Sequence, residues 1–192
     1  MKKFIWLSLA LGTVLVACPF QLNVPTIPND YLGASGNTLI ADLNARRASP
    51  TVATPVNCTA SLSNPSQFPA RIYTSSVAAL TRDSRLDTAA HSHADFLAKK
   101  YPNFVPAGVD PHNGAGDGAI NQRTVAAGFS NQVVGEILAY GFSSNSSVIN
   151  AWMTSTNGHC QNIMDLDFNR VGVAKINFGA SNTYWVVVFG KI

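Results

Sequence analysis

The sequence predicts a single α+β domain in which helices come first and β-strands come last. Of its 192 residues, 46% are hydrophobic and 12% are charged, a composition typical of a globular chain that buries a core. Helical periodicity dominates the earlier part, whereas two β-branched and aromatic runs end the chain. Because helices and strands are not interleaved as in βαβ units, we expect an α+β fold rather than a parallel sheet.

The first 17 residues have the layout of a secretory signal peptide. Two lysines precede an apolar stretch that is too short to span a bilayer comfortably. The run Leu-Val-Ala-Cys ending at Cys18 is similar to the bacterial lipobox, whose cysteine becomes lipid-modified. We therefore expect export and a lipid anchor at Cys18, on the outer face of a bacterial membrane. The alternative is ordinary cleavage near Ala17, which would release the protein.

The charge of the chain argues against nucleic acid as a partner. Its formal net charge is +3, from 13 basic and 10 acidic residues, and the basic residues are scattered. Such a distribution offers little counterion release on a phosphate backbone. We expect a monomer whose membrane contact is the N-terminal lipid.

The first half of the mature chain contains two predicted helices. Residues 18–35 are rich in proline and predict an extended tether. A helix is expected over residues 38–48, capped by Asn37 or Thr38. After a long loop, a second helix is expected over residues 83–101, because apolar side chains recur there at three- and four-residue spacing.

Two histidines in the second predicted helix are expected to be structural. His93 lies on the apolar stripe and His91 lies off it. Nothing else in this segment completes a metal-binding shell, so neither is placed in the candidate site.

The second half is expected to hold further helices and then a hairpin. A short helix is predicted near residues 122–127, and another from Ser146 or Ser147 through Met153. The final elements are two antiparallel strands over residues 171–178 and 183–189, joined by a turn at residues 179–182.

Two cysteines remain if Cys18 carries lipid, namely Cys58 and Cys160. In an exported protein an even pair argues for one disulfide, which would close a loop of about a hundred residues. A reactive or metal-ligating thiol at Cys160 is the alternative.

Six segments of the chain carry a resemblance to a known family. In chain order they are residues 44–46, 86–94, 112–129, 135–139, 151–164 and 184–190. Together they resemble the CAP superfamily, also called the SCP domain, and the most specific is residues 151–164, which is similar to the signature of bacterial members. The resemblance implies a CAP domain over residues 36–192, built as a three-layer α-β-α sandwich with a small antiparallel sheet and a central cleft. It also implies pairing of Cys58 with Cys160.

The resemblance assigns three cleft residues, and the chain departs from the family at two other places. His112, Glu136 and His159 match the family's cleft set. Ile137 replaces an asparagine whose amide could orient the neighbouring glutamate, and Ser155 stands where animal and plant members carry a second glutamate. Ser155 is included in the cleft, although a local hydrogen bond at a helix end explains it more simply.

Glu136 is the only glutamate in the chain, and its neighbours are apolar. Two imidazoles and one carboxylate suit zinc and leave a position for water, so His112, His159 and Glu136 are tentative ligands for Zn²⁺ or another divalent cation. A hydrogen-bonded cluster that ties loops together is the alternative.

Three functions follow as hypotheses. The first is an exported binding module whose cleft holds a divalent cation and a lipidic or cell-envelope ligand. The second is a metal-dependent hydrolase, perhaps peptidase-like, that uses His112, His159 and Glu136. The third is an extracellular scaffold with a vestigial cleft. Fold-level kinship does not choose among them.

Overall fold

The structure is a computed structural model that describes residues 33–130, 134–178 and 182–192. The predicted signal peptide, Cys18, the predicted tether up to residue 32 and turn residues 179–181 lie outside these ranges. Among the helices of the described residues, none combines the length and the apolar composition needed to cross a bilayer.

Five helices and six strands follow one another in the described residues. In chain order they are α1 (Gly33–Ala48), β1 (Val56–Cys58), β2 (Arg71–Tyr73), β3 (Thr81–Arg82), α2 (Ser84–Lys100), α3 (Ile120–Ala126), β4 (Val134–Tyr140), α4 (Asn145–Met153), α5 (His159–Ile163), β5 (Arg170–Asn177) and β6 (Thr183–Gly190).

Four strands form the central sheet in the order β3-β5-β6-β4. The three long strands β5, β6 and β4 pair antiparallel, as predicted. The two-residue strand β3 adds a parallel pairing to β5, so the sheet is mixed. Strands β1 and β2 form a separate two-stranded sheet. The strand β4 lies at one edge of the central sheet, and this edge carries the candidate site.

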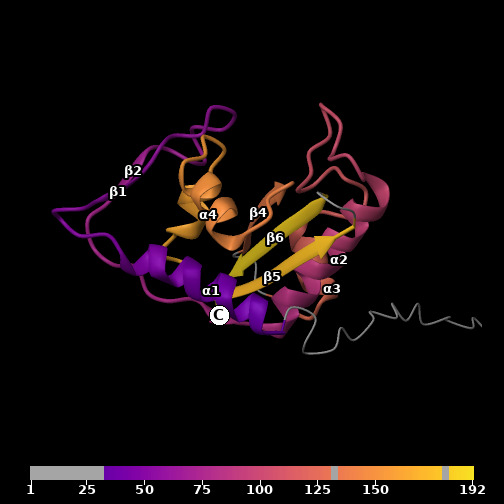
Figure 1. The fold of residues 1–192 in the computed structure, drawn as a ribbon, viewed down its shortest axis with the longest axis horizontal. Helices are drawn as coiled ribbons and strands as arrows, with labels where there is room; N and C mark the ends of the chain where they lie inside the picture. Colours follow the sequence, from indigo (N-terminus) through magenta and orange to yellow (C-terminus); the bar gives the residue numbers. More distant parts are fainter. Residues whose placement is uncertain (1–32, 131–133, 179–181) are drawn as a thin grey trace, which may run out of the picture.

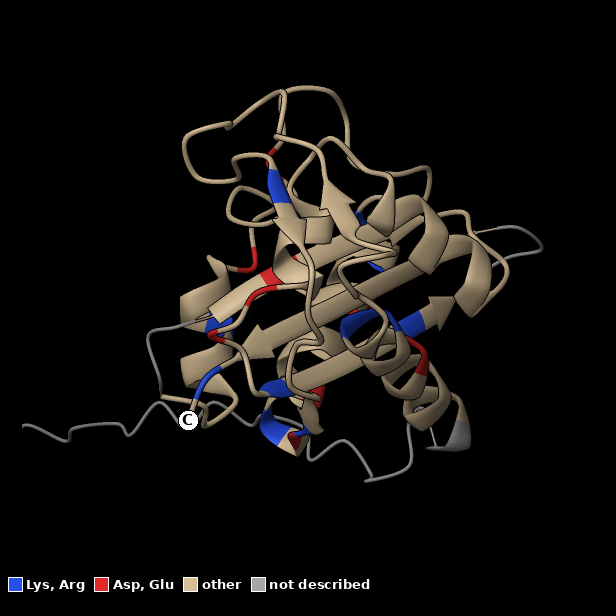
Figure 2. Ribbon diagram, turned by 90° about the vertical axis from the view of Figure 1, so that its left-hand side faces the viewer, with Lys and Arg blue, Asp and Glu red and all other residues tan. Residues whose placement is uncertain are grey.

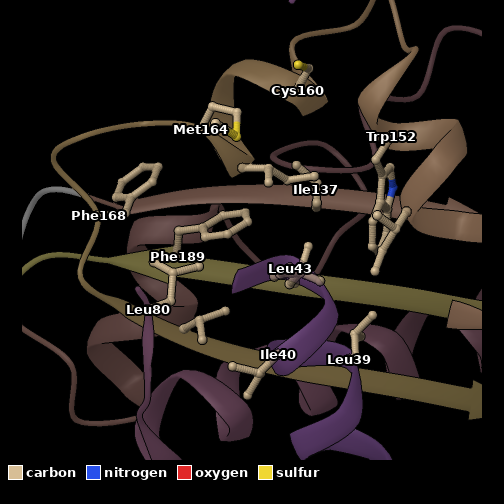
Figure 3. Packing of buried hydrophobic residues seen from close by; sticks show 14 of the residues in the cluster. Leu39, Ile40, Leu43, Leu80, Ile137, Trp152, Cys160, Met164, Phe168 and Phe189 are labelled. Carbon is tan, nitrogen blue, oxygen red and sulfur yellow. The ribbon is translucent and has the colours of Figure 1, made fainter. Parts of the chain in front are cut away.

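Helices cover both faces of the sheet and make the predicted three layers (Figure 1). Figure 2 shows the same ribbon turned by 90°, with the positions of Lys, Arg, Asp and Glu spread over it. Every residue of β6 is buried because its side chains alternate between two cores. Val186 and Val188 pack with α2, whereas Val187 and Phe189 belong to the core beneath α1, α4 and α5. Figure 3 shows the second core, where Leu43 of α1 lies among side chains of the sheet and of the α4–α5 region.

Helix α2 confirms its prediction closely. Asp83 is the N-cap, and its side chain accepts a hydrogen bond from the backbone N of Arg85. The helix packs directly on β5 at Gly172, where any Cβ would overlap the backbone of Leu86. The short helix α3 and the helix α4 also lie where the sequence predicted them, with Ser144 rather than Ser146 or Ser147 capping α4.

Helix α1 begins earlier than predicted. Asn37 and Thr38 lie inside this helix, which starts at Gly33, so neither is its cap. Instead, the side-chain oxygen of Asn37 accepts a hydrogen bond from Arg82. The strands β1, β2, β3 and β4 and the helix α5 were not expected from the residue pattern.

The disulfide between Cys58 and Cys160 is formed, which confirms the predicted pairing and excludes a free thiol at Cys160. The two Cα atoms are 5.4 Å apart across a sequence separation of 102 residues. It links β1 to α5, and both cysteines are buried in the core under α1 and α4.

Candidate functional site

A cavity of about 780 Å³ lies beside the edge strand β4. Its walls come from three parts of the chain, namely residues 61–71, residues 104–120 and residues 157–168, together with β4 itself. His112, Glu136 and His159 all line this cavity. The structure therefore brings together the three residues that the resemblance assigned to the cleft. Its volume is within the range of cavities that hold small ligands.

Glu136 projects from β4 toward the α2 and α3 side of the sheet and is held by two partners. Its side chain is only 2% exposed. One carboxylate oxygen, Oε1, lies 2.9 Å from Nδ1 of His112, and the other, Oε2, accepts a hydrogen bond of 2.7 Å from Nη2 of Arg123. Such charge-assisted bonds fix both oxygens in the wall of the cavity.

These partners decide the charge of Glu136. Burial alone raises the pKa of a carboxyl group, because the ionised form loses its hydration. Here the hydrogen bond with His112 and the charges of His93 and Arg123 outweigh burial and hold the pKa of Glu136 below its ordinary value. Glu136 is consequently a carboxylate at neutral pH.

A second layer of buried polar groups supports Glu136 from α2. His93 is fully buried, with its Nδ1 2.6 Å from Asp117 and its Nε2 3.7 Å from Glu136. His93 is buried, as expected of a structural histidine. It also faces Glu136, although the sequence did not place it in the candidate site. Asp117 orients the imidazole of His93 through this contact. His91 does not line the cavity.

Arg123 is the residue of this site whose role was not assigned from the sequence. Besides Glu136, it donates hydrogen bonds to the carbonyl oxygens of His112 and Gly118, and it is 7% exposed. Two signals in the sequence point to it: Arg123 lies within the segment 112–129 that resembles the CAP family, and it is a single arginine among the uncharged residues of α3. Through Arg123, α3 fixes the loop that carries His112.

His159 enters the cavity from the opposite wall as the first residue of α5. Gly158 precedes it with φ of 83°, the left-handed conformation, and a Cβ there would come within 2.6 Å of the Phe68 ring. Nδ1 of His159 is buried without a hydrogen-bond partner among the described residues. Burial, aided by nearby His112, lowers the pKa of His159 to about 4, so the imidazole is neutral at pH 7.

The two departures from the family have local explanations. Ile137 is fully buried and points to the core under α1 and α4, on the opposite face of β4 from Glu136. Arg123 and His112 orient Glu136 without an amide at position 137. Ser155 is not among the residues that line the cavity, and its Oγ accepts a local hydrogen bond of 3.1 Å from the backbone N of Asn157. Its inclusion in the cleft is therefore corrected.

The residues present do not form a complete zinc shell. Within the described ranges, no group of three or more histidine, cysteine, aspartate or glutamate side chains is arranged to hold a metal ion. Glu136 has both oxygens engaged by other side chains, so it does not act as a third ligand in this arrangement. Of the three ligands predicted from the sequence, the imidazoles of His112 and His159 remain available at the cavity.

Three solved structures resemble this fold. An outer surface protein from Borrelia burgdorferi matches with a TM-score of 0.58 at 20% identity, covering 81% of this chain and 90% of its own. An extracellular protein containing an SCP domain from Bacillus anthracis gives a TM-score of 0.53 at 14% identity, over 86% of this chain and 44% of its own. A cysteine-rich secretory protein from Staphylococcus aureus gives 0.51 at 14% identity, over 84% of this chain and 40% of its own.

These similarities concern the fold, and the chain spans less than half the length of the Bacillus and Staphylococcus proteins. Among curated proteins, no sequence matches significantly. The profile of the CAP family, described as the cysteine-rich secretory protein family, matches residues 43–189. That span contains every segment that lines the cavity, the disulfide and nearly all of the sandwich. The match establishes that this chain belongs to the CAP family.

Proposed function

We propose that this protein is an exported binding module whose cavity beside β4 takes a small ligand from the cell envelope. The observation that carries the proposal is the cavity of about 780 Å³ with His112, Glu136 and His159 in its wall. Glu136 is held by hydrogen bonds with His112 and Arg123, and a preorganised polar group of this kind orients a ligand at little entropic cost.

Two features support export. The Cys58–Cys160 disulfide is stable in an oxidising compartment rather than in a reducing cytosol. The first 17 residues have the layout of a signal peptide. Our proposal includes lipid attachment at Cys18, with the domain held at the outer face of a bacterial membrane. Intact-mass analysis of membrane fractions tests the anchor, and an unmodified Cys18 there would remove it.

Fragment screening by protein-observed NMR tests the binding module. Small polar fragments are expected to shift the resonances of residues on both walls of the cavity, such as Phe68, His112 and Asn157. Shifts confined to exposed apolar residues such as Leu62 and Ile72, or no shifts at all, would contradict the proposal and favour a scaffold with a vestigial cleft.

A divalent cation at the two imidazoles is a second candidate, favoured by one specific observation. Glu136 engages Nδ1 of His112, an arrangement in which a carboxylate fixes a histidine that can bind metal through Nε2. The imidazole of His159 is neutral at pH 7, as a ligand must be.

Calorimetric titration with Zn²⁺ tests this candidate. The affinity is expected to fall at least tenfold in His112→Ala and in His159→Ala, and to stay unchanged in the control His91→Ala. Equal affinity in all four proteins would exclude a cation between the two imidazoles.

The hydrolase hypothesis requires Glu136 to act as a base or a metal ligand. Its lowered pKa and its two engaged oxygens make it a weak proton acceptor. Metal-dependent turnover of peptide, ester or glycan substrates that is lost in Glu136→Gln would nevertheless establish the hydrolase.

A further inference from the structure

The wall of the cavity is unusually rich in neutral polar side chains. Two serines, Ser61 and Ser63, line it together with six carboxamides: Asn64, Gln67, Asn113, Asn157, Gln161 and Asn162. A carboxamide both donates and accepts hydrogen bonds, so it complements a ligand whose surface alternates between donors and acceptors. A simple acyl chain offers no such groups, and it would desolvate the donors and acceptors of this wall that the protein itself leaves unpaired.

The charges in the wall disfavour an anionic ligand. Among the described residues that line the cavity, Arg71 is the one Lys or Arg, whereas Asp110, Glu136 and Asp165 are carboxylates. Arg123 compensates the charge of Glu136 from behind the wall, which leaves Asp110 and Asp165 against Arg71. A phosphate, a fatty acid or an anionic lipid headgroup would therefore find no surplus of positive charge there, whereas a neutral ligand needs none.

One carboxamide of the wall holds an acceptor oxygen without a partner. Gln161 is 4% exposed, and its Nε2 donates hydrogen bonds to the backbone oxygens of Thr59 and Pro69, at 2.7 and 3.0 Å. These bonds use both of its protons, and its Oε1 is buried with no partner in the described part of the chain. An enclosed acceptor without a partner is unfavourable, and a donor on a ligand would relieve it once the amide turns toward the cavity.

Asn162, one residue later, is also held by its amide nitrogen. It is 9% exposed, and its Nδ2 donates to the backbone oxygen of Gly158 at 3.1 Å. Its Oδ1 lies against β4 at Gly135, where a Cβ would come within 2.6 Å of it. Gly135 therefore leaves room for this oxygen beside the strand.

An exposed aromatic ring completes the wall. Phe104 is 44% exposed and has φ of 74°, a conformation that is costly for a residue with a bulky side chain. Its ring is held against Tyr140 and Tyr184, with centroids 5.5 and 6.3 Å away. Phe104 also lines the cavity, and an exposed aromatic ring is a group on which the C–H face of a sugar ring stacks.

We propose that the ligand is an uncharged envelope glycan that carries N-acetylated sugars. Its hydroxyls would pair with the carboxamides and serines, its acetamido N–H with Gln161 or Asn162, and a ring face with Phe104. A peptide would instead need charged or apolar subsites for its varied side chains. This inference rests on the proposed binding function and names the class of ligand.

Calorimetric titration of the purified full-length chain with the tetramer of N-acetylglucosamine tests the proposal. The expected result is saturable binding at least tenfold tighter than that of the glucose tetramer with the same β-1,4 linkage, which lacks acetamido groups. Phosphatidylglycerol vesicles and an unstructured polar peptide should not bind at the cavity.

Matched variants locate the binding. Phe104→Leu is expected to weaken it at least tenfold, and Asn157→Ala about threefold or more. Phe178→Leu is the control for the ring, because Phe178 stacks on Tyr184 but does not line the cavity. Asn121→Ala, on the exposed face of α3, is the control for the amide, and both controls should stay within twofold.

Each other outcome overturns the inference. Equal affinity for the two tetramers would show that the acetamido groups are not recognised. Unchanged affinity in Phe104→Leu and Asn157→Ala would show that the sugar does not bind in the cavity. Preference for the vesicles or the peptide assigns the ligand to another class. If NMR fragments enter the cavity while neither sugar binds, the glycan is excluded and the binding module stands. If neither the fragments nor the sugars bind in the cavity, the glycan inference and the proposed binding module are both excluded.

Discussion

At the scale of single residues, the site depends on how the negative charge of Glu136 is compensated. The carboxylate is buried, but each of its oxygens has a partner, and Arg123 supplies the opposite charge. A buried pair of this kind is costly to break, because the remaining charge has no other compensation.

Glu136→Gln should therefore lower the free energy of unfolding by about 3 kcal/mol, since the guanidinium of Arg123 would stay buried without an anion. Urea denaturation checks this value. The control is Asp95→Asn, which breaks an exposed pair with Lys99 and should cost about 0.5 kcal/mol or less. Equal costs in the two variants would mean that Arg123 is not paired with Glu136 in solution.

His159 makes stability depend on pH. Its pKa is lowered to about 4 in the fold, mainly by burial, while an unfolded chain has an ordinary imidazole with a pKa near 6.5. Between these values the unfolded state binds the extra proton, so stability is full above pH 7 and falls as the pH drops through this window.

The slope between pH 5.5 and 7 should shrink by up to about 1.4 kcal/mol per pH unit in His159→Gln. Burial also lowers the pKa of His91, but this contribution is present in both proteins, so the difference between the two slopes reports His159. Urea titrations at several pH values in the presence of a chelator measure the slope. An unchanged slope would show that His159 is not buried as a neutral imidazole.

The sequence predicted some residues of the site and missed others for a physical reason. His112, Glu136 and His159 stand in motifs that resemble those of the CAP family, and the fold gathers them. His93 and Arg123 come from helices whose local pattern gives no hint of the contact they make across the sheet edge. Ser155 was misplaced because its position in the motif says nothing about its local hydrogen bond.

At the scale of elements, length decides what the sequence could predict. The helix α2 and the strands β5 and β6 are long enough to show a period or a β-branched run. The strands β1, β2 and β3 have two or three residues each, too few for any pattern. The strand β4 is apolar on both faces apart from Glu136, so it shows no alternation.

Arg47 attaches the C-terminal end of α1 to the rest of the fold. It is a fully buried cation, and no pattern in the sequence indicated this role. Its guanidinium donates hydrogen bonds to four backbone oxygens, those of Ala78, Ile163, Asp165 and Phe168. Burial lowers the pKa of Arg47 to about 10, which still leaves it charged at neutral pH.

Arg47→Met should lower the free energy of unfolding by at least about 3 kcal/mol, because it leaves several buried carbonyls without donors. The matched control is the neighbouring Arg46→Met, which removes one exposed hydrogen bond to Asn150 and should cost less than about 1 kcal/mol. Thermal and urea unfolding measure both values. Similar losses in the two variants would contradict the buried position of Arg47.

At the scale of the whole molecule, the disulfide joins two segments that lie far apart in the sequence and line the same cavity. Residues 49–70 include only one short strand, yet they supply part of the cavity wall. Cys58–Cys160 fixes this region to α5, which carries His159. The resemblance to the CAP family predicted the sandwich and this pairing, whereas the detailed course of the loops depends on contacts between distant residues.

Replacing both cysteines, Cys58→Ala with Cys160→Ala, should lower the free energy of unfolding by about 3–5 kcal/mol, as expected for a loop of this length. The wild-type protein measured under reducing conditions should lose the same amount. If the double variant is as stable as the oxidised protein, the disulfide does not constrain the unfolded chain.

The cavity beside β4 is proposed as the ligand site, and a crystal structure of the protein soaked with the fragments found by NMR tests this most directly. Ligand density is expected between the walls that carry His112 and His159, with Glu136 still bonded to Arg123. Density only on outer surfaces, or a structure in which His112 and His159 line different surfaces, would contradict it.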